Sequence, residues 1–141
     1  MARSSLVLAV TTAAAGAAAL GHTALAVSTA GAAVPAHGRS GVYVVGIAGA
    51  TLLWAAAIVL TRSVAIAFAG GVLAGGAAAN LVSLALWPSV PGVPNPLLAG
   101  NVAFNVADLS VAAGVLLLLA AAAVFAARNR VRLREPVRIR S

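Results

Sequence analysis

Residues 63–87 read SVAIAFAGGVLAGGAAANLVSLALW and contain no charged side chain. A helix that crosses a bilayer needs about 20 apolar residues, so this stretch predicts a membrane-spanning helix. Within it, Gly71 and Gly75 form a GxxxG pair among other small residues. Small residues let helix backbones approach closely in lipid. The segment therefore predicts a helix with a face for close packing, which would bring Asn80 near the fourth predicted helix, at about 104–127.

The composition of the whole chain indicates the same environment. Its 141 residues are 62% hydrophobic and 8% charged, with a mean hydropathy of +1.08, whereas a soluble domain carries about 25% charged residues. Three more stretches are long and apolar enough to span a membrane, at about 6–28, 41–61 and 104–127. The sequence thus predicts an all-α integral membrane protein with four transmembrane helices in a domain at 1–127, followed by a basic tail at 128–141.

The arginines predict how the helices are oriented. All nine basic residues are arginines, and cytoplasmic loops are enriched in positive charge. With both termini in the cytoplasm, Arg3, Arg62 and the six arginines of the tail lie inside, and Arg39 alone lies outside. The excess of arginine over lysine is typical of GC-rich bacterial genomes. We therefore expect a multi-pass protein of the bacterial cytoplasmic membrane, whose tail binds anionic lipid headgroups rather than nucleic acid.

The first apolar stretch has a second interpretation. The start MARSS, the alanine-rich run and Ala-x-Ala sites also describe a secretory signal peptide. The apolar core of a cleaved signal is about 7–15 residues long, whereas this stretch extends over residues 6–28. We therefore expect it to be retained as a helix.

The acidic residues are two, Asp108 and Glu135, and Glu135 lies in the tail. Asp108 lies a few residues into the fourth predicted helix, close to the outer interface. Asn105 precedes it by three residues and so shares its helix face.

Polar residues from elsewhere in the chain are expected at the same depth. Asn80 lies 17 residues after Ser63, which corresponds to a rise of about 25 Å from the inner side. Ser83 can share its face, and Asn95 and Asn101 lie in the proline-rich loop directly above. The sequence therefore predicts one polar cluster below the outer interface, between the third and fourth helices.

Metal and cofactor sites are not expected. The chain has no cysteine, which excludes disulfides and cysteine ligands, and its two histidines and two acids are too few for a typical zinc site. His22 and His37 have no acid nearby in the sequence. We predict that both stand apart from any functional site.

The polar cluster is carried by motifs that resemble a known family. GGAAAN at 75–80 and FNVAD at 104–108, followed by LSVAAG, resemble the bacterial lipoprotein signal peptidase (signal peptidase II) family. The resemblance covers roughly residues 70–120. It implies a four-helix membrane protein with both termini in the cytoplasm. It also implies an aspartic endopeptidase that cleaves signal peptides from diacylglyceryl-modified prolipoproteins near the outer leaflet.

The resemblance assigns site residues one by one. Asp108 matches one of the two catalytic aspartates of the family, and Asn80 and Asn105 match its site asparagines, expected to hold the substrate or the aspartate. The second aspartate of the family follows a glycine and a valine in the outer loop, where PGVPNP places Asn95 in this chain.

Other family features are missing. An Asp-Arg pair that normally follows the site asparagine is replaced by Ser83 and Leu84, and the acidic and lysine-bearing box of the first helix has no counterpart near LGHTAL. The outer-loop Asn-x-Gly box is at best echoed by RSG at 39–41.

These departures predict an incomplete catalytic dyad. Aspartic proteolysis uses two adjacent carboxylates that share a proton, and the amide of Asn95 cannot ionise. Glu135 is expected across the membrane from Asp108. We therefore expect a signal peptidase II-like protein that binds a lipid-modified prolipoprotein or signal-peptide helix, with little or no activity. The alternative is a small non-catalytic membrane scaffold or helix-binding protein, in which Asp108 is a helix cap or an interhelical partner. A transporter is a third possibility, but it has little support, because Asp108 is the one carboxylate expected within the spans and it lies close to the membrane surface.

Overall fold

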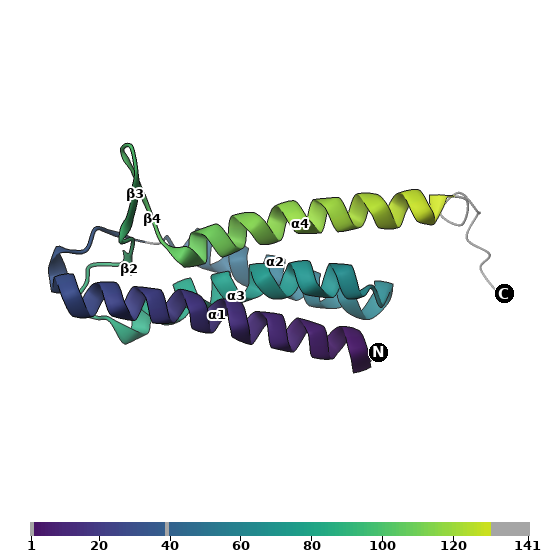
Figure 1. The fold of residues 1–141 in the computed structure, drawn as a ribbon, viewed down its shortest axis with the longest axis horizontal. Coiled ribbons are helices and arrows are strands. Elements are labelled where there is room, and N and C mark those ends of the chain that lie inside the picture. Colours follow the sequence, from purple (N-terminus) through teal and green to yellow (C-terminus); the bar gives the residue numbers. More distant parts are fainter. Residues whose placement is uncertain (1, 39, 131–141) are drawn as a thin grey trace.

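The computed structural model describes residues 2–38 and 40–130. Four long helices dominate this part of the chain (Figure 1). They are α1 (Ala2–Ala30), α2 (Gly41–Thr61), α3 (Val64–Leu86) and α4 (Val106–Arg128). The predicted helical fold class is confirmed. By length and hydropathy, α3, α4 and the part of α1 from Arg3 could each cross a membrane. In α2, the apolar stretch found among the described residues is Val44–Trp54, which is shorter than these three.

The helix boundaries follow from local capping. Ser63 caps α3, because its hydroxyl oxygen accepts a hydrogen bond of 3.3 Å from the backbone N–H of Ile66. Arg62 lies just before it with a φ of 51°, which reverses the chain between α2 and α3. Asn105 caps α4 in the same way.

Short strands gather at one end of the bundle, which we call the strand end (Figure 1). There β1 (Ala36–His37) pairs antiparallel with β2 (Val93–Pro94), and β3 (Leu97–Ala99) pairs antiparallel with β4 (Val102–Phe104). A single 3₁₀ turn, η1 (Gly31–Ala33), lies between α1 and β1 in the described part of the chain. The predicted helix start at residue 104 is wrong, because Phe104 pairs with Leu97 in the β3–β4 hairpin.

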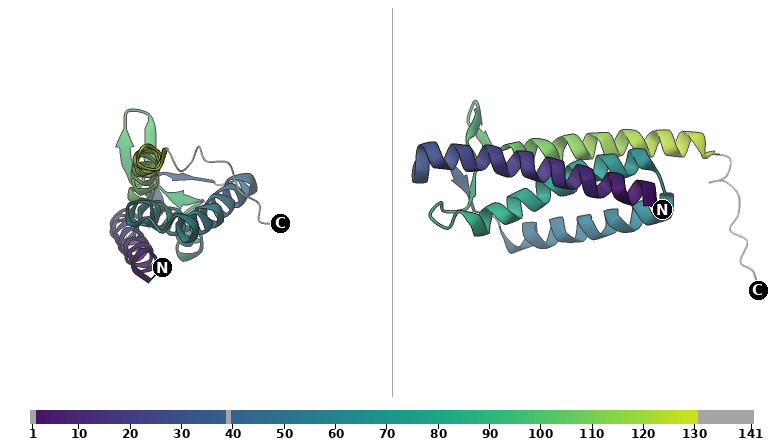
Figure 2. Two further views of the ribbon diagram at one scale, coloured as in Figure 1. Left: turned by 90° about the vertical axis from the view of Figure 1, so that its right-hand side faces the viewer. Right: turned by 60° about the horizontal axis from the view of Figure 1, so that its bottom comes forward.

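The opposite end of the bundle, which we call the arginine end, is where α1 begins, α2 leads into α3, and α4 ends (Figures 1 and 2). Four arginines of the described chain lie at this end, and all four are exposed: Arg3, Arg62, Arg128 and Arg130.

Helix α3 lies at the centre, with the other helices around it (Figure 2). Its glycines allow three close approaches. A Cβ atom on Gly75 would lie 2.5 Å from the carbonyl oxygen of Thr12 in α1, and one on Gly76 would lie 2.5 Å from that of Ala107 in α4. A Cβ atom on Gly70 would overlap the indole ring of Trp54 in α2. The predicted packing face is therefore present, but the GxxxG pair faces α1, and it is Gly76 that brings α4 close to α3.

Helix α4 approaches α3 most closely in its first half. Its buried residues are Ala107 and Gly114, and a Cβ atom on Gly114 would lie 2.5 Å from the backbone nitrogen of Leu73. Beyond this point Leu118 and Phe125 pack against a buried cluster that includes Trp54 and Ile66, whereas Leu116 and Leu119 face outward and are 68% and 63% exposed. An apolar surface of this kind suits contact with a lipid bilayer.

Candidate functional site

Three asparagines and Asp108 meet at the strand end, as the sequence predicts. Asn80 comes from α3, Asn95 from the segment after β2, and Asn105 from the start of α4. Each of the three asparagines is only 1% exposed. Buried amides are costly unless they are hydrogen-bonded, and the hydrogen bonds described next satisfy them.

Asn105 is the centre of the network. Its Nδ2 group donates to Asn80 Oδ1 at 2.9 Å, to Asn95 Oδ1 at 3.0 Å and to the Pro94 carbonyl at 3.0 Å. Its Oδ1 atom accepts from the backbone N–H of Asp108 at 2.8 Å. One side chain thereby connects α3, the segment that follows β2, and the first turn of α4.

Asp108 uses both carboxylate oxygens as acceptors. Asn80 Nδ2 donates to Oδ1 at 2.8 Å, and the backbone N–H of Asn105 donates to Oδ2 at 3.2 Å. Asn105 and Asp108 thus form a reciprocal capping box. The carboxylate also lies beside the α4 N-terminus, where the helix dipole favours a negative charge. Asp108 is half-buried, so its side chain is held in place while still reaching the surface.

His37 is part of this site, and the prediction that it stands apart is wrong. Its Nδ1 atom is hydrogen-bonded to Asn95 Nδ2. The pairing of β1 with β2 brings the two residues together, and the Asn95 N–H donates to the Pro35 carbonyl at 2.7 Å. His37 and Asn95 are 58 residues apart in the sequence, so no helical or strand periodicity could have predicted their contact.

The network also determines which nitrogen of His37 accepts. Asn95 Oδ1 receives a hydrogen bond from Asn105, so the amide NH₂ group of Asn95 faces His37. His37 Nδ1 is therefore the acceptor, and in the neutral ring Nε2 carries the hydrogen. The imidazole can offer this N–H to another molecule.

A cavity of about 280 Å³ adjoins the network. It brings together a carboxylate, an amide and an imidazole beside an apolar strand, and its lining residues are His37, Asn95, Val102, Ala103, Phe104 and Asp108. Asp108 can accept a proton or a hydrogen bond from a ligand, and His37 can donate one to a carbonyl oxygen. Asn95 and Asp108, the two positions that the family resemblance pairs, thus line the same cavity.

Other polar residues of the prediction lie apart from the network. The Ser83 hydroxyl donates to the Ala79 carbonyl at 2.7 Å within α3, and Asn101 is exposed at the turn between β3 and β4. His22 Nδ1 is buried in α1 with no hydrogen-bond partner among the described residues. Arg39, Glu135 and most of the basic tail lie outside the described residues.

The described residues include no group of three histidines, cysteines or acids that could hold a metal ion. No family model matches the chain, and neither a curated protein nor a solved structure matches it.

Proposed function

We propose that this chain is a divergent member of the lipoprotein signal peptidase family that binds a lipid-modified prolipoprotein or its signal-peptide helix, and that hydrolyses it weakly or not at all. The observation that carries the proposal is that Asn95 and Asp108 line one cavity and are joined through Asn105. These are the positions at which an aspartyl dyad would lie, and here one of the two is an amide.

The proposal places four spans in the bacterial cytoplasmic membrane, with both termini in the cytoplasm. Asp108 and Arg128 are 20 residues apart on α4, which corresponds to a rise of about 30 Å. The hydrocarbon core of a bilayer is about 30 Å thick. The cavity beside Asp108 would then open at the outer interface, while the exposed arginines of the opposite end face the cytoplasm, in agreement with the positive-inside rule. The packing of α1 on Gly75 supports its retention as a helix.

The site suits binding better than hydrolysis. A peptide segment that leaves the membrane beside β4 could donate an N–H to Asp108 and accept the Nε2–H of His37 through a carbonyl oxygen. Hydrolysis also needs an acid at the second position, and the Asn95 amide cannot take part in proton transfer. General acid–base catalysis contributes typically 10²- to 10⁴-fold, so turnover by this mechanism should be very slow.

Restoring the second carboxylate tests the proposal. The full chain in proteoliposomes is incubated with a synthetic diacylglyceryl-modified prolipoprotein, and binding and cleavage are measured separately. We expect binding with little cleavage, and we expect Asn95→Asp to raise cleavage by about 10²-fold. Adding Asp108→Asn to that variant should abolish the gain.

Asn101→Asp is the matched control, because it introduces the same carboxylate at an exposed position of the neighbouring turn. It should leave cleavage unchanged. Wild-type cleavage at an appreciable rate that Asp108→Asn abolishes would show that the site is an active peptidase. Absence of binding, with no gain from Asn95→Asp, would overturn the assignment.

A non-catalytic scaffold is the second candidate, and the completeness of the capping box favours it. Both oxygens of Asp108 already accept hydrogen bonds within the protein, as expected of a purely structural joint between α3 and α4. In that case Asp108→Ala would lower the yield of folded protein, while the folded fraction would bind prolipoprotein no differently from wild type.

A further inference from the structure

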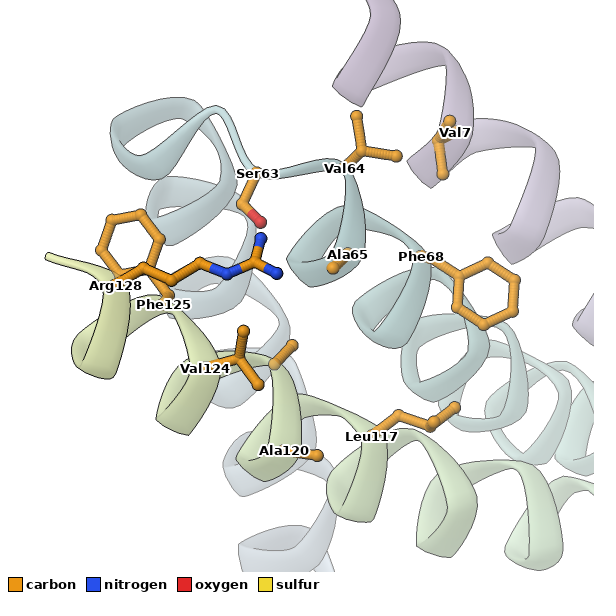
Figure 3. Close-up of a pocket in the computed structure, with 11 residues that line it drawn as sticks. Val7, Ser63, Val64, Ala65, Phe68, Leu117, Ala120, Val124, Phe125 and Arg128 are labelled. Carbon is orange, nitrogen blue, oxygen red and sulfur yellow. The ribbon is translucent and has the colours of Figure 1, made fainter.

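A second cavity, of about 840 Å³, lies near the arginine end between α3 and α4, and Val7 of α1 reaches it (Figure 3). We call it the α3–α4 groove. Its walls are mostly apolar, and several of its side chains are well exposed: Phe68 is 46%, Leu117 42% and Val124 50% exposed. Its polar side chains are those of Ser63 and Arg128.

The length of the α3–α4 groove corresponds to one leaflet. Along α4 it extends from Leu117 to Arg128, which are 11 residues and therefore about 16 Å apart. Half of a hydrocarbon core is about 15 Å. With α4 across the bilayer, the apolar part of the groove lies at the depth of one set of acyl chains, and Arg128 lies at the depth of the headgroups.

The charge at this end favours an anion. Figure 3 shows the Arg128 side chain extending from α4 toward the side of the groove where Ser63 lies. The other described arginines of this end, Arg3, Arg62 and Arg130, are exposed around it. Asp108, the one acidic residue in the described part of the chain, lies at the strand end. A guanidinium group pairs with phosphate oxygens through two parallel hydrogen bonds.

We propose that the α3–α4 groove binds an anionic phospholipid, with one acyl chain in the groove and its phosphate on Arg128. A transmembrane helix of a partner protein fits less well, because it would run through the full membrane thickness, whereas the groove ends at Leu117. The site is specific to one arginine and one groove, and so differs from general attraction between the tail and the membrane surface. It does not depend on the proposed peptidase-like function.

Lipid retention by the purified full chain tests this site. The chain in detergent is mixed with phosphatidylglycerol and phosphatidylcholine that carry identical acyl chains, and bound lipids are counted by native mass spectrometry. We expect phosphatidylglycerol to be retained about fivefold over phosphatidylcholine, the effect of one arginine near an anionic headgroup. Arg128→Gln should remove the preference.

Arg130→Gln is the matched control, because it removes an equal charge two residues away and outside the groove. It should keep the preference. Ala120→Trp, which places a large side chain in the groove, should reduce retention of both lipids.

Three results would overturn the proposal. The first is a preference that survives Arg128→Gln, and the second is one that Arg130→Gln removes equally. The third comes from a crosslinking experiment on wild-type protein. Phosphatidylglycerol with a photoreactive acyl chain is expected to crosslink to residues of the α3–α4 groove. Adducts elsewhere, or crosslinks between two copies of the chain in place of lipid adducts, would exclude the groove as its site.

Discussion

Removing the Asn105 side chain should destabilise the protein by about 3 kcal/mol. Asn105 is 1% exposed. Asn105→Ala would remove the cap on the Asp108 N–H, worth about 1 kcal/mol. It would also remove two amide hydrogens that serve three acceptors, Asn80 Oδ1, Asn95 Oδ1 and the Pro94 carbonyl. At about 1 kcal/mol per hydrogen bond, these contribute about 2 kcal/mol.

A second substitution separates the two contributions. Asn105→Ser keeps an oxygen that can cap α4 but has no amide group, so we expect it to cost about 2 kcal/mol, the bridging part alone. Asn101→Ala is the control, because Asn101 is exposed at the adjacent β3–β4 turn. Its effect should stay within about 0.5 kcal/mol.

The measurement is the free energy of unfolding of the full chain in detergent, by titration with sodium dodecyl sulfate. Tryptophan fluorescence gives the signal, from Trp87 directly after α3 and from Trp54 in α2. Two results would contradict this prediction. A cost of Asn105→Ala below about 1 kcal/mol would mean that the network does not join the elements. Equal costs for Asn105→Ala and Asn105→Ser would mean that the cap contributes nothing.

Three further predictions concern packing, the loop contact and topology. Gly76→Ala should destabilise the protein by about 1–3 kcal/mol in the same titration, because its Cβ would lie 2.5 Å from the Ala107 carbonyl oxygen. His37→Leu removes the side-chain partner of Asn95 Nδ2. We therefore expect faster hydrogen exchange of the backbone N–H of Asn95, which donates to the Pro35 carbonyl, as measured by mass spectrometry. The chain has no cysteine, so single cysteines report topology: in intact cells an impermeant maleimide should label Leu98→Cys and not Arg130→Cys.

Each of these predictions has its own control and its own contrary result. Gly21→Ala meets no atom within 4 Å and should be neutral or stabilising by up to about 1 kcal/mol. A similar loss for Gly21→Ala and Gly76→Ala would contradict the close approach of α3 and α4. Unchanged hydrogen exchange of the backbone N–H of Asn95 in His37→Leu would show that His37 does not stabilise the segment that follows β2. Labelling of Arg130→Cys from outside would reverse the proposed orientation.

The helices and most of the polar cluster were predictable because both follow from local pattern. Apolar runs of the right length define the four helices, and a rise of 1.5 Å per residue brings Asn80 to the level of Asp108. The capping box of Asn105 and Asp108 is also local, because the two residues are only three positions apart in the sequence. The helix ends were less accurate, because β4 takes Phe104 from the predicted start of α4.

The loop partners were not predictable in the same way. His37 joins the site through pairing of the two-residue strands β1 and β2, and strands this short have no hydrophobic period that indicates their partner. The face used by each glycine also depends on where the neighbouring helices lie. The pair Gly71 and Gly75 was recognisable as a packing motif, but its partner α1 became evident only from the fold.

Helix α4 is held against the bundle at two levels. Toward the strand end, Ala107 and Gly114 lie close against α3. Toward the arginine end, Leu118, Ala121 and Phe125 pack against a buried cluster on α2 and α3. The wall of the α3–α4 groove that α4 provides is therefore fixed by packing inside the protein, so the groove should keep its width when the surrounding lipid changes.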